Sequence, residues 1–314
     1  TRFKCDWSSD VCSSDLGLSI LCRNLAMSGL LIKTGEAYRN GRLASTALNA
    51  RHAAYRKDYL DLMASHWQDW ARLSESVRTG RPLDEDVPEE PGYRRRFTWA
   101  MHYRTLETAP KIAGQVDLHG ADTLLDLGGG PGTYAMAFLA KHPRLRATVG
   151  DRPEALEVAR EIASTHKAGS RLSYVPVDFT KEAIPGTYDV IWYSNVLHIY
   201  SPETNRAVFR RARAALNPGG RLLIQDAFLH DREGLRPADA SLFAVSMLLF
   251  TEEGNTYSAK ETSVWLKEAG FATTRVLRMK PGTEDWEDGI LEAVAPGGLS
   301  RKRLKKPVQQ GRSK

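Results

Sequence analysis

The sequence predicts an α/β fold in which a mostly parallel, doubly wound sheet follows a smaller helical region. Two observations predict it. From residue 123 onward, short apolar runs alternate with segments whose apolar residues recur at helical spacing. The first run, LLDL at residues 124–127, ends in the glycine-rich stretch GGGPG at residues 128–132. An apolar run stopped by glycines is typical of a buried parallel strand entering a tight turn.

The strands and helices of the sheet follow in order. We expect parallel strands over residues 124–127, 147–150, 172–177, 190–194 and 221–226, the last one after an NPGG turn. The helices between them cover residues 134–141, 154–164 and 203–216. A further helix over residues 258–269 has Ser258 as its N-cap and Gly270 as its C-cap. Strands over residues 271–279 and 289–295 then form an antiparallel end of the sheet.

The region before the sheet is predicted to be helical. A helix over residues 18–31 precedes two glycine-containing turns between short β-prone pieces, an order typical of the end of a winged helix. Because this helix offers only Arg23 and Asn24 for DNA contacts, we favour a dimerisation module over a DNA-binding one. The next helix, residues 53–78, carries Trp67 and Trp70, which we expect in the core or at a subunit contact. Residues 93–116 return to helix.

Composition divides the chain into five segments. Residues 1–16 resemble the translation of a sequencing-library adapter, so we treat them as non-native and expect the natural N-terminus to be missing. Residues 17–80 form the first domain, residues 81–92 a proline-containing linker and residues 93–298 the main domain. Residues 299–314 carry seven Lys and Arg and no acid, whereas the net charge of the whole chain is +6. The rest is therefore close to neutral, and we expect a disordered basic tail without a specific partner.

Cysteine use and hydropathy limit the location and the partners. Once residues 1–16 are excluded, Cys22 is the one cysteine left, and it can form neither a disulfide framework nor a metal site. This suits a reducing cytoplasm, where we expect the protein. No run of 18 or more apolar residues occurs, so we expect no membrane partner. Because helix 18–31 offers few cations and the chain before the tail is close to neutral, we expect no nucleic-acid partner either.

The glycine loop predicts a nucleotide-like ligand. A dinucleotide fingerprint fails, because Thr133 stands where its last glycine would be. The pattern present is an acid followed by alternating glycines, formed by Asp126, Gly128, Gly130 and Gly132. Asp151 ends the next strand, at a spacing that lets a carboxylate accept hydrogen bonds from a ribose diol. A glycine loop of an NAD enzyme or of a domain that binds nothing stays open at this point.

A second polar group follows the fourth strand. The stretch YDVIWYSNVLHIYSPE at residues 188–203 brings Ser194, Asn195 and His198 to the carboxyl edge of the sheet, where ligands bind in α/β folds. Together with LLDLGGGPG, GDRP, VDF, LNPGGRLLIQD and EAGF, in that order, this stretch resembles the class I S-adenosylmethionine-dependent methyltransferases. It is similar in particular to the small-molecule O-methyltransferases, which include the caffeic acid and acetylserotonin enzymes. The resemblance runs from about residue 22 to residue 279.

The resemblance implies a Rossmann-like catalytic domain, an N-terminal winged-helix dimerisation domain, a homodimer and S-adenosylmethionine as cofactor. It implies that Gly128, Gly130 and Gly132 line the methionine and ribose part, and that Asp151 binds the ribose hydroxyls. The other cofactor contacts that it implies are Asp178 and Phe179 at the adenine, Asp126 at the amino-acid end, and Ser194, where many relatives carry Lys. His198 would take the proton from the acceptor hydroxyl, and Asp226 would orient it.

Two departures from the family keep alternatives open. Ile199 stands where the family has Asp, and Thr256 stands where it has a second glutamate. A carbon or nitrogen methyltransferase would tolerate both changes, and His198 could then be structural. A winged-helix DNA-binding regulator is the third hypothesis.

The acceptor site is predicted to be apolar. Helix 241–250 is apolar on nearly every face, which is typical of a helix that lines a pocket or lies in the core. The residues expected to line the pocket with His198 are Met101, Trp192, Phe228, Phe243, Met247 and Phe250. Such a pocket suits a small aromatic or polyketide-like hydroxyl compound.

Overall fold

The computed structural model describes residues 15–52, 54–83, 92–231, 233–278 and 289–297. Its chain divides into two compact units, residues 1–65 and residues 66–314. The division falls within helix α3 (Lys57–Ala71), whereas the predicted linker is residues 81–92, of which 84–91 lie outside the described residues. The segment predicted to be non-native, up to residue 14, and the basic tail also lie outside them.

The first unit contains a helix followed by a hairpin. Its elements before α3 are α1 (Asp15–Met27), β1 (Leu31–Thr34), β2 (Ala37–Asn40) and α2 (Arg42–Thr46). β1 and β2 pair antiparallel. A Cβ at Gly41 would lie 2.1 Å from the carbonyl oxygen of Gly29, so a side chain there would prevent this close approach. The order of helix and hairpin agrees with the sequence pattern, which does not predict α2, and the winged-helix assignment stays a prediction.

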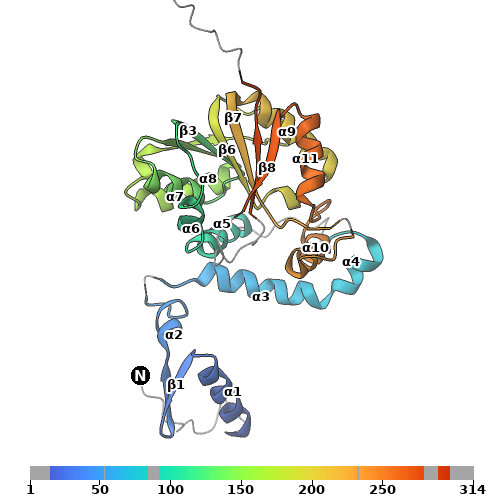
Figure 1. The fold of residues 1–314 in the computed structure, drawn as a ribbon. Helices are drawn as coiled ribbons and strands as arrows, with labels where there is room; N and C mark the ends of the chain where they lie inside the picture. The colour runs from blue at the N-terminus through green and yellow to red at the C-terminus, as the bar shows by residue number, and fades with distance from the viewer. Residues whose placement is uncertain (1–14, 53, 84–91, 232, 279–288, 298–314) are drawn as a thin grey trace, which may run out of the picture. The chain divides into compact units, whose positions relative to one another are not determined.

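The second unit is built on one seven-stranded sheet, visible in Figure 1. The strand order is β5-β4-β3-β6-β7-β9-β8. The strands are β3 (Thr123–Leu127), β4 (Arg146–Asp151), β5 (Leu172–Pro176), β6 (Tyr188–Ser194), β7 (Leu216–Gln225), β8 (Thr273–Leu277) and β9 (Ile290–Val294). The neighbours from β5 to β7 pair in parallel, and β9 pairs antiparallel with both β7 and β8. The predicted parallel sheet with an antiparallel end is therefore confirmed.

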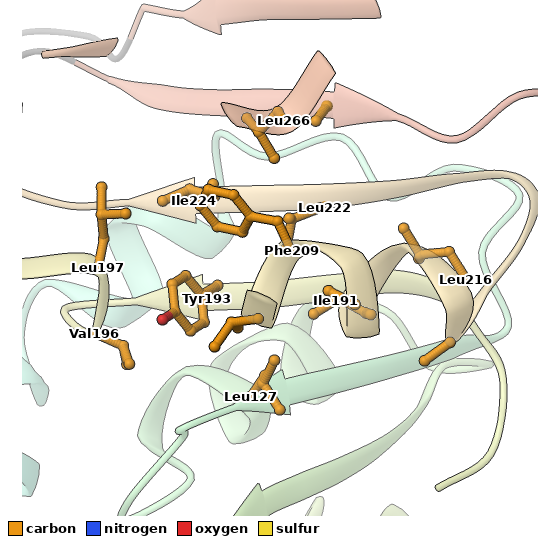
Figure 2. Close-up of a cluster of buried hydrophobic side chains, with 14 of the residues drawn as sticks. Leu127, Ile191, Tyr193, Val196, Leu197, Phe209, Leu216, Leu222, Ile224 and Leu266 are labelled. Atoms are coloured by element: carbon orange, nitrogen blue, oxygen red, sulfur yellow. The ribbon is translucent and has the colours of Figure 1, made fainter. Parts of the chain in front are cut away.

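Helices cover both faces of this sheet. Helices α7 (Thr133–Lys141) and α8 (Pro153–Ser164) pack on one face, and α9 (Pro202–Ala214) and α11 (Ala259–Glu268) on the other. The other helices that follow α3 are α4 (Leu73–Thr79), α5 (Tyr93–Thr105), α6 (Ala109–Ala113) and α10 (Ala238–Phe250), with short 3₁₀ turns η1 (Gly169–Arg171) and η2 (Leu197–Ile199). A buried apolar core lies on each face of the sheet, and the residues of β6 point alternately into one core and into the other, because successive strand side chains point to opposite faces. Tyr193 packs with Phe209 and Leu266 of α9 and α11 (Figure 2), and Trp192 packs with Phe138 of α7. None of the described helices is long and apolar enough to cross a membrane.

Several boundaries differ from the sequence pattern. The NPGG stretch belongs to β7 instead of preceding it, and Asn217 within it donates a hydrogen bond to Asp189 at 2.7 Å. The helix predicted over residues 53–78 is interrupted at Arg72, between α3 and α4. The helix predicted over residues 93–116 likewise divides into α5 and α6. Ser258 caps α11 in a capping box with Glu261, as its position predicts.

The C-terminal end of α11 and the tryptophans of α3 add further detail. The C-cap of α11 is Ala269, and Gly270 follows it with a φ of 92°. Trp67 is 80% exposed and Trp70 is 39% exposed. The sequence predicted Trp67 either in the core or at a subunit contact. Within the described chain the core position is wrong, and the subunit contact stays a prediction.

The antiparallel end of the sheet contains one buried carboxylate. Glu292 of β9 is 1% exposed, and it pairs with Arg221 of β7 at 3.2 Å and with Arg275 of β8.

We predict that Glu292→Ala lowers the free energy of unfolding by about 3 kcal/mol, because the variant leaves the largely buried Arg221 without its ion pair. Chemical denaturation checks this. Glu203→Ala, which removes an 80% exposed partner of Arg206, is the control and should change little. Equal effects of the two variants would contradict the prediction.

Candidate active site

The glycine loop joins β3 to α7 and presents an open backbone. Gly128, Gly130 and Gly132 have φ values of 69°, 49° and 69°, a region that favours glycine. A Cβ at Gly128 would lie 2.8 Å from a methyl group of Val196, so a side chain does not fit there. No described atom lies within 4 Å of the place that a Cβ of Gly130 would take. The loop therefore has one packed side and one side that a ligand can approach.

Asp151, at the end of β4, is bonded to this loop. One carboxylate oxygen accepts a hydrogen bond from the Gly130 N–H at 2.7 Å, and the other accepts one from the Arg152 N–H at 2.7 Å. Burial raises the pKa of Asp151, and these two N–H groups oppose that rise. Each oxygen keeps a further lone pair, so the carboxylate can accept from a diol as well.

Asp126 ties the end of β3 to the first turn of α7. It is 2% exposed, and one of its oxygens accepts a hydrogen bond from the Ala135 N–H at 3.1 Å. Burial raises the pKa of Asp126 to about 7, against the effect of that hydrogen bond. A Cβ at Gly129 would lie 2.5 Å from the Asp126 carboxyl carbon, so the second glycine of GGG is needed for this acid.

Asp178 and Phe179 follow β5 at the same edge of the sheet. Asp178 accepts hydrogen bonds from the Thr180 N–H at 3.1 Å and from the Thr180 hydroxyl at 2.5 Å, and the hydroxyl lowers the pKa of Asp178. Phe179 is 6% exposed, and its ring reaches the glycine loop, 3.4 Å from the place of a Gly128 Cβ. The structure therefore brings Phe179 to the loop, while the bonds that Asp178 makes are those of a turn.

Polar side chains meet where β6 and β7 end. The Ser194 hydroxyl donates a hydrogen bond to the Gln225 side chain at 2.9 Å and accepts one from the Asn195 amide at 3.1 Å. Asn195 has a φ of 55°, which is uncommon for a residue other than glycine. The sequence analysis missed Gln225, although a polar residue at the end of an apolar strand was a visible signal.

His198 and Asp226 form a buried pair beside this group. The Nδ1 atom of His198, in η2, lies 2.7 Å from an Asp226 carboxylate oxygen, and the side chains are 9% and 2% exposed. The same oxygen accepts a hydrogen bond from the Ala227 N–H at 2.8 Å. The sequence places the two residues 28 positions apart, and the adjacent parallel strands bring them together.

The residues predicted to line the acceptor site are brought together only in part. The ring of Phe243 in α10 meets the ring of His198 edge-on, with centroids 4.8 Å apart. Met247 and Phe250 follow Phe243 at helical spacing on α10, and Phe250 stacks on His66 with centroids 4.3 Å apart. Burial lowers the pKa of His66, a residue that the sequence analysis did not select.

The remaining acceptor candidates occupy other positions. Trp192 is fully buried against the rings of Tyr134 and Phe138, so it fills the core on the α7 side and does not join the group at His198. Phe228 lies in the core cluster around Tyr193. Met101 is half-buried in α5, whose next residue, His102, is hydrogen-bonded to Thr133 at the start of α7 at 2.9 Å.

Comparison with known proteins identifies the family. A model of the O-methyltransferase domain matches residues 70–272 of this chain. The chain belongs to the O-methyltransferase family. The match includes the glycine loop, Asp151, His198 and Asp226 of this enzyme.

Relatives and solved structures agree with this assignment. The 3-hydroxy-5-methyl-1-naphthoate 3-O-methyltransferase of Streptomyces sahachiroi is 30% identical over 83% of this chain and 78% of its own length. The acetylserotonin O-methyltransferase of Bos taurus is 30% identical over 88% of this chain and 84% of its own. The structure of an O-methyltransferase family protein from Burkholderia thailandensis superposes with a TM-score of 0.76 at 26% identity, covering 90% of this chain and 85% of that one.

These comparisons confirm the resemblance to the O-methyltransferases, together with the fold, the activity and the cofactor that it implies. The fold is a Rossmann-like methyltransferase fold, and the enzyme is an O-methyltransferase that depends on S-adenosylmethionine. Oxygen is therefore favoured over the carbon or nitrogen acceptor that Ile199 and Thr256 left open. The family model that matches residues 70–272 describes an O-methyltransferase domain, so it does not support the hypothesis of a DNA-binding regulator.

Asp126 should make the stability of the O-methyltransferase depend on pH. Its folded-state pKa of about 7 lies above the usual 3.8, so the folded state loses stability as the pH rises from about 4 to about 7. We predict that the stability of Asp126→Asn relative to the wild type increases by about 2 kcal/mol between pH 5.5 and pH 8. Denaturant unfolding at both pH values measures it.

Asp178→Asn is the matched control for the Asp126 prediction. The folded protein holds the pKa of Asp178 below its usual value of 3.8. The wild type should therefore gain stability relative to Asp178→Asn as the pH rises through the range just below 3.8. Above that range the difference should stay constant. If the difference between Asp126→Asn and the wild type were also constant from pH 5.5 to pH 8, Asp126 would not be protonated in the folded protein.

Proposed function

We propose that this O-methyltransferase methylates a hydroxyl group of a small aromatic or polyketide-like molecule, with His198 as the general base and Asp226 as its orienting partner. The bond of 2.7 Å between His198 Nδ1 and Asp226 carries the proposal. An ionised carboxylate can only accept a hydrogen bond, so it selects the tautomer with the proton on Nδ1. The lone pair of Nε2 is then available for a proton.

His198 supplies the step that the acceptor needs. A phenol is a poor nucleophile until it loses its proton, and imidazole is the side chain suited to accept it near neutral pH. When Nε2 takes the proton, Asp226 stabilises the imidazolium across the Nδ1 bond. S-adenosylmethionine supplies an electrophilic methyl group on a sulfonium that leaves readily, so the protein mainly has to align the two reactants.

The residues around the glycine loop fit the cofactor. The open backbone at Gly130 leaves room beside a carboxylate, Asp151, that can bind a ribose diol. Phe179 lies where a flat ring could pack, with Asp178 next to it. Gly128, Gly132 and Asp126 shape the turn towards the methionine end, and Ser194 lies at the end of β6 near that region.

The acceptor class follows from the residues beside His198. Phe243, Met247 and Phe250 give α10 an apolar face, and Met101 of α5 is a further candidate contact. Apolar and aromatic surfaces of this kind suit a planar, multi-ring molecule. The relative whose name gives it a hydroxylated naphthoate as substrate supports this class.

A homodimer formed through the N-terminal domain, residues 17–80, is part of the proposal. Trp67 and Val77 of α3 and α4 are 80% and 64% exposed within the described chain, and large apolar side chains of this kind favour burial in an interface. The catalytic domain would then be residues 93–298. We place the enzyme in the cytoplasm, without a membrane or nucleic-acid partner.

Calorimetric titration with S-adenosylhomocysteine tests the cofactor site. We predict micromolar binding by the wild type and at least 100-fold weaker binding by Asp151→Ala, since two charge-assisted hydrogen bonds contribute about 3 kcal/mol. Glu154→Ala, an exposed change at the start of α8, should leave the affinity unchanged. Equal affinity in Asp151→Ala and the wild type would remove Asp151 from the cofactor site, and no binding by folded wild type would refute the site as a whole.

His198→Ala tests the base. With a phenolic acceptor that the wild type methylates, we predict that kcat falls by about 10²- to 10⁴-fold, because the acceptor keeps its proton. The affinity for S-adenosylhomocysteine should not change. His166→Ala, an exposed histidine after α8, is the control and should retain full turnover. Turnover retained in His198→Ala would exclude His198 as the base.

A further inference from the structure

The loop that carries His198 has irregular backbone. It connects the end of β6 to the start of α9, and only the short turn η2 is regular within it. The bond from His198 to Asp226 fixes the ring at one atom. Catalysis by the ring also requires that the backbone on both sides of His198 holds still, because a displacement of about 1 Å can cost about 100-fold in rate.

Asn205, in α9, holds this loop from one side. Its side-chain nitrogen lies 2.9 Å from the Leu197 carbonyl oxygen, 2.9 Å from that of Tyr200 and 3.1 Å from that of Ser201. These carbonyl groups lie directly before His198 and just after it. Asn205 is 0% exposed, and its own side-chain oxygen is 3.4 Å from the Tyr193 hydroxyl.

The chemistry of these partners fixes the orientation of the amide. Three carbonyl oxygens can only accept hydrogen bonds, so the group facing them must be the donor NH₂. Turned the other way, the amide would place its oxygen against all three. A buried amide in the apolar cluster of Tyr193 and Phe209 is costly unless it is bonded, and here both of its ends have partners.

Helix α9 does not require Asn205 for its own start. Ser201 is the N-cap, and its hydroxyl oxygen accepts a hydrogen bond from the Thr204 N–H at 3.3 Å. An aliphatic side chain in place of Asn205 would leave the buried carbonyl groups of the loop without this donor. The bonds that are peculiar to Asn205 are therefore those to the His198 loop.

The opposite side of the loop is held by the segment before α11. The Asn255 N–H donates to the carbonyl oxygen of His198 at 2.9 Å, and the Tyr257 hydroxyl donates to that of Tyr200 at 2.8 Å. A Cβ at Gly254 would lie 2.5 Å from the His198 carbonyl oxygen, so this contact is close. Asn205 adds the bond to the Leu197 carbonyl group, before His198, and shares the Tyr200 carbonyl group, after it, with Tyr257.

We propose that Asn205 is a positioning residue for methyl transfer: its amide holds the backbone on both sides of His198, and thereby keeps the imidazole in register with Asp226 and the acceptor hydroxyl. The proposal rests on the proposed role of His198 as the base. It goes beyond that role because Asn205 touches neither reactant and acts only through the loop.

Turnover of a series of phenols with increasingly acidic hydroxyl groups tests the proposal. Asn205→Ala removes the donor, and Asn205→Asp keeps the shape but replaces the donor with acceptors. We expect both variants to lower kcat by about 10- to 100-fold for the least acidic phenol. The loss should shrink towards the most acidic phenol, which needs the base least, and the affinity for S-adenosylhomocysteine should stay within twofold of the wild type.

Asn217→Ala is the matched control, because it also removes an asparagine amide bond, at the opposite end of β6. It should leave kcat unchanged across the series. A loss in the Asn205 variants that is equal for all phenols, or a loss confined to the melting temperature, would overturn the proposal. Asn205→Ser, whose single hydroxyl donor is too short to hold the carbonyl groups on both sides of His198, gives the same comparison if the other variants do not fold, and full activity in that variant would also overturn the proposal.

His198→Ala separates failure of the inference from failure of the proposed function. If His198→Ala loses turnover most strongly for the least acidic phenol and the Asn205 variants do not, His198 is the base and the positioning role of Asn205 is wrong. If His198→Ala retains turnover across the series, the proposed base is wrong, whatever the Asn205 variants show.

Discussion

The parallel pairing of β6 with β7 is the constraint on which the chemistry proposed for this enzyme depends. Ser194 lies opposite Gln225 in that pairing, at the carboxyl end of both strands. Residues that follow the two strands therefore leave the sheet at the same edge, which is where α/β folds bind ligands. Asp226 is the next residue after β7, and the loop after β6 needs only four residues to bring His198 to it at 2.7 Å.

The proposed cofactor half of the site depends on the neighbouring pair, β3 and β4. Asp126 at the end of β3 and Asp151 at the end of β4 are both buried, and burial raises the pKa of each. Each acid accepts a hydrogen bond from the backbone between β3 and the first turn of α7. Buried carboxyl groups cost stability, and their concentration at one edge of the sheet is typical of a functional site.

The sequence predicted the parts of the fold that follow from local patterns. The five parallel strands come from short apolar runs, the loop from its glycines and the start of α11 from Ser258, and each of these signals is local in the sequence. The division between α3 and α4 at Arg72 has no such signal, since helix formers continue through it. Trp67 shows that helical spacing of aromatic residues does not by itself predict burial, because the same spacing occurs on a buried face and on an exposed one.

The candidate site was predictable to the extent that its residues follow strands. Asp151, His198 and Asp226 do, whereas Asn205 is recognisable only from its partners. A buried polar residue inside a helix or strand has the same local pattern as an exposed one, and three-dimensional contacts decide between them. Trp192 is close to His198 in the sequence, but side chains along β6 point alternately to opposite faces of the sheet. Trp192 therefore lies in the core on the α7 side and not at the site.

The two departures from the family pattern can be judged by the same geometry. His198 as the proposed base needs one partner on Nδ1, and Asp226 provides it from the end of β7. Ile199 packs against the core cluster, a position that suits an aliphatic side chain. Thr256 is 4% exposed and follows Asn255, whose N–H bonds the His198 carbonyl group. Both changes therefore leave the Nδ1 bond in place, and the orientation of the imidazole rests on one carboxylate and on the hydrogen bonds that hold its loop.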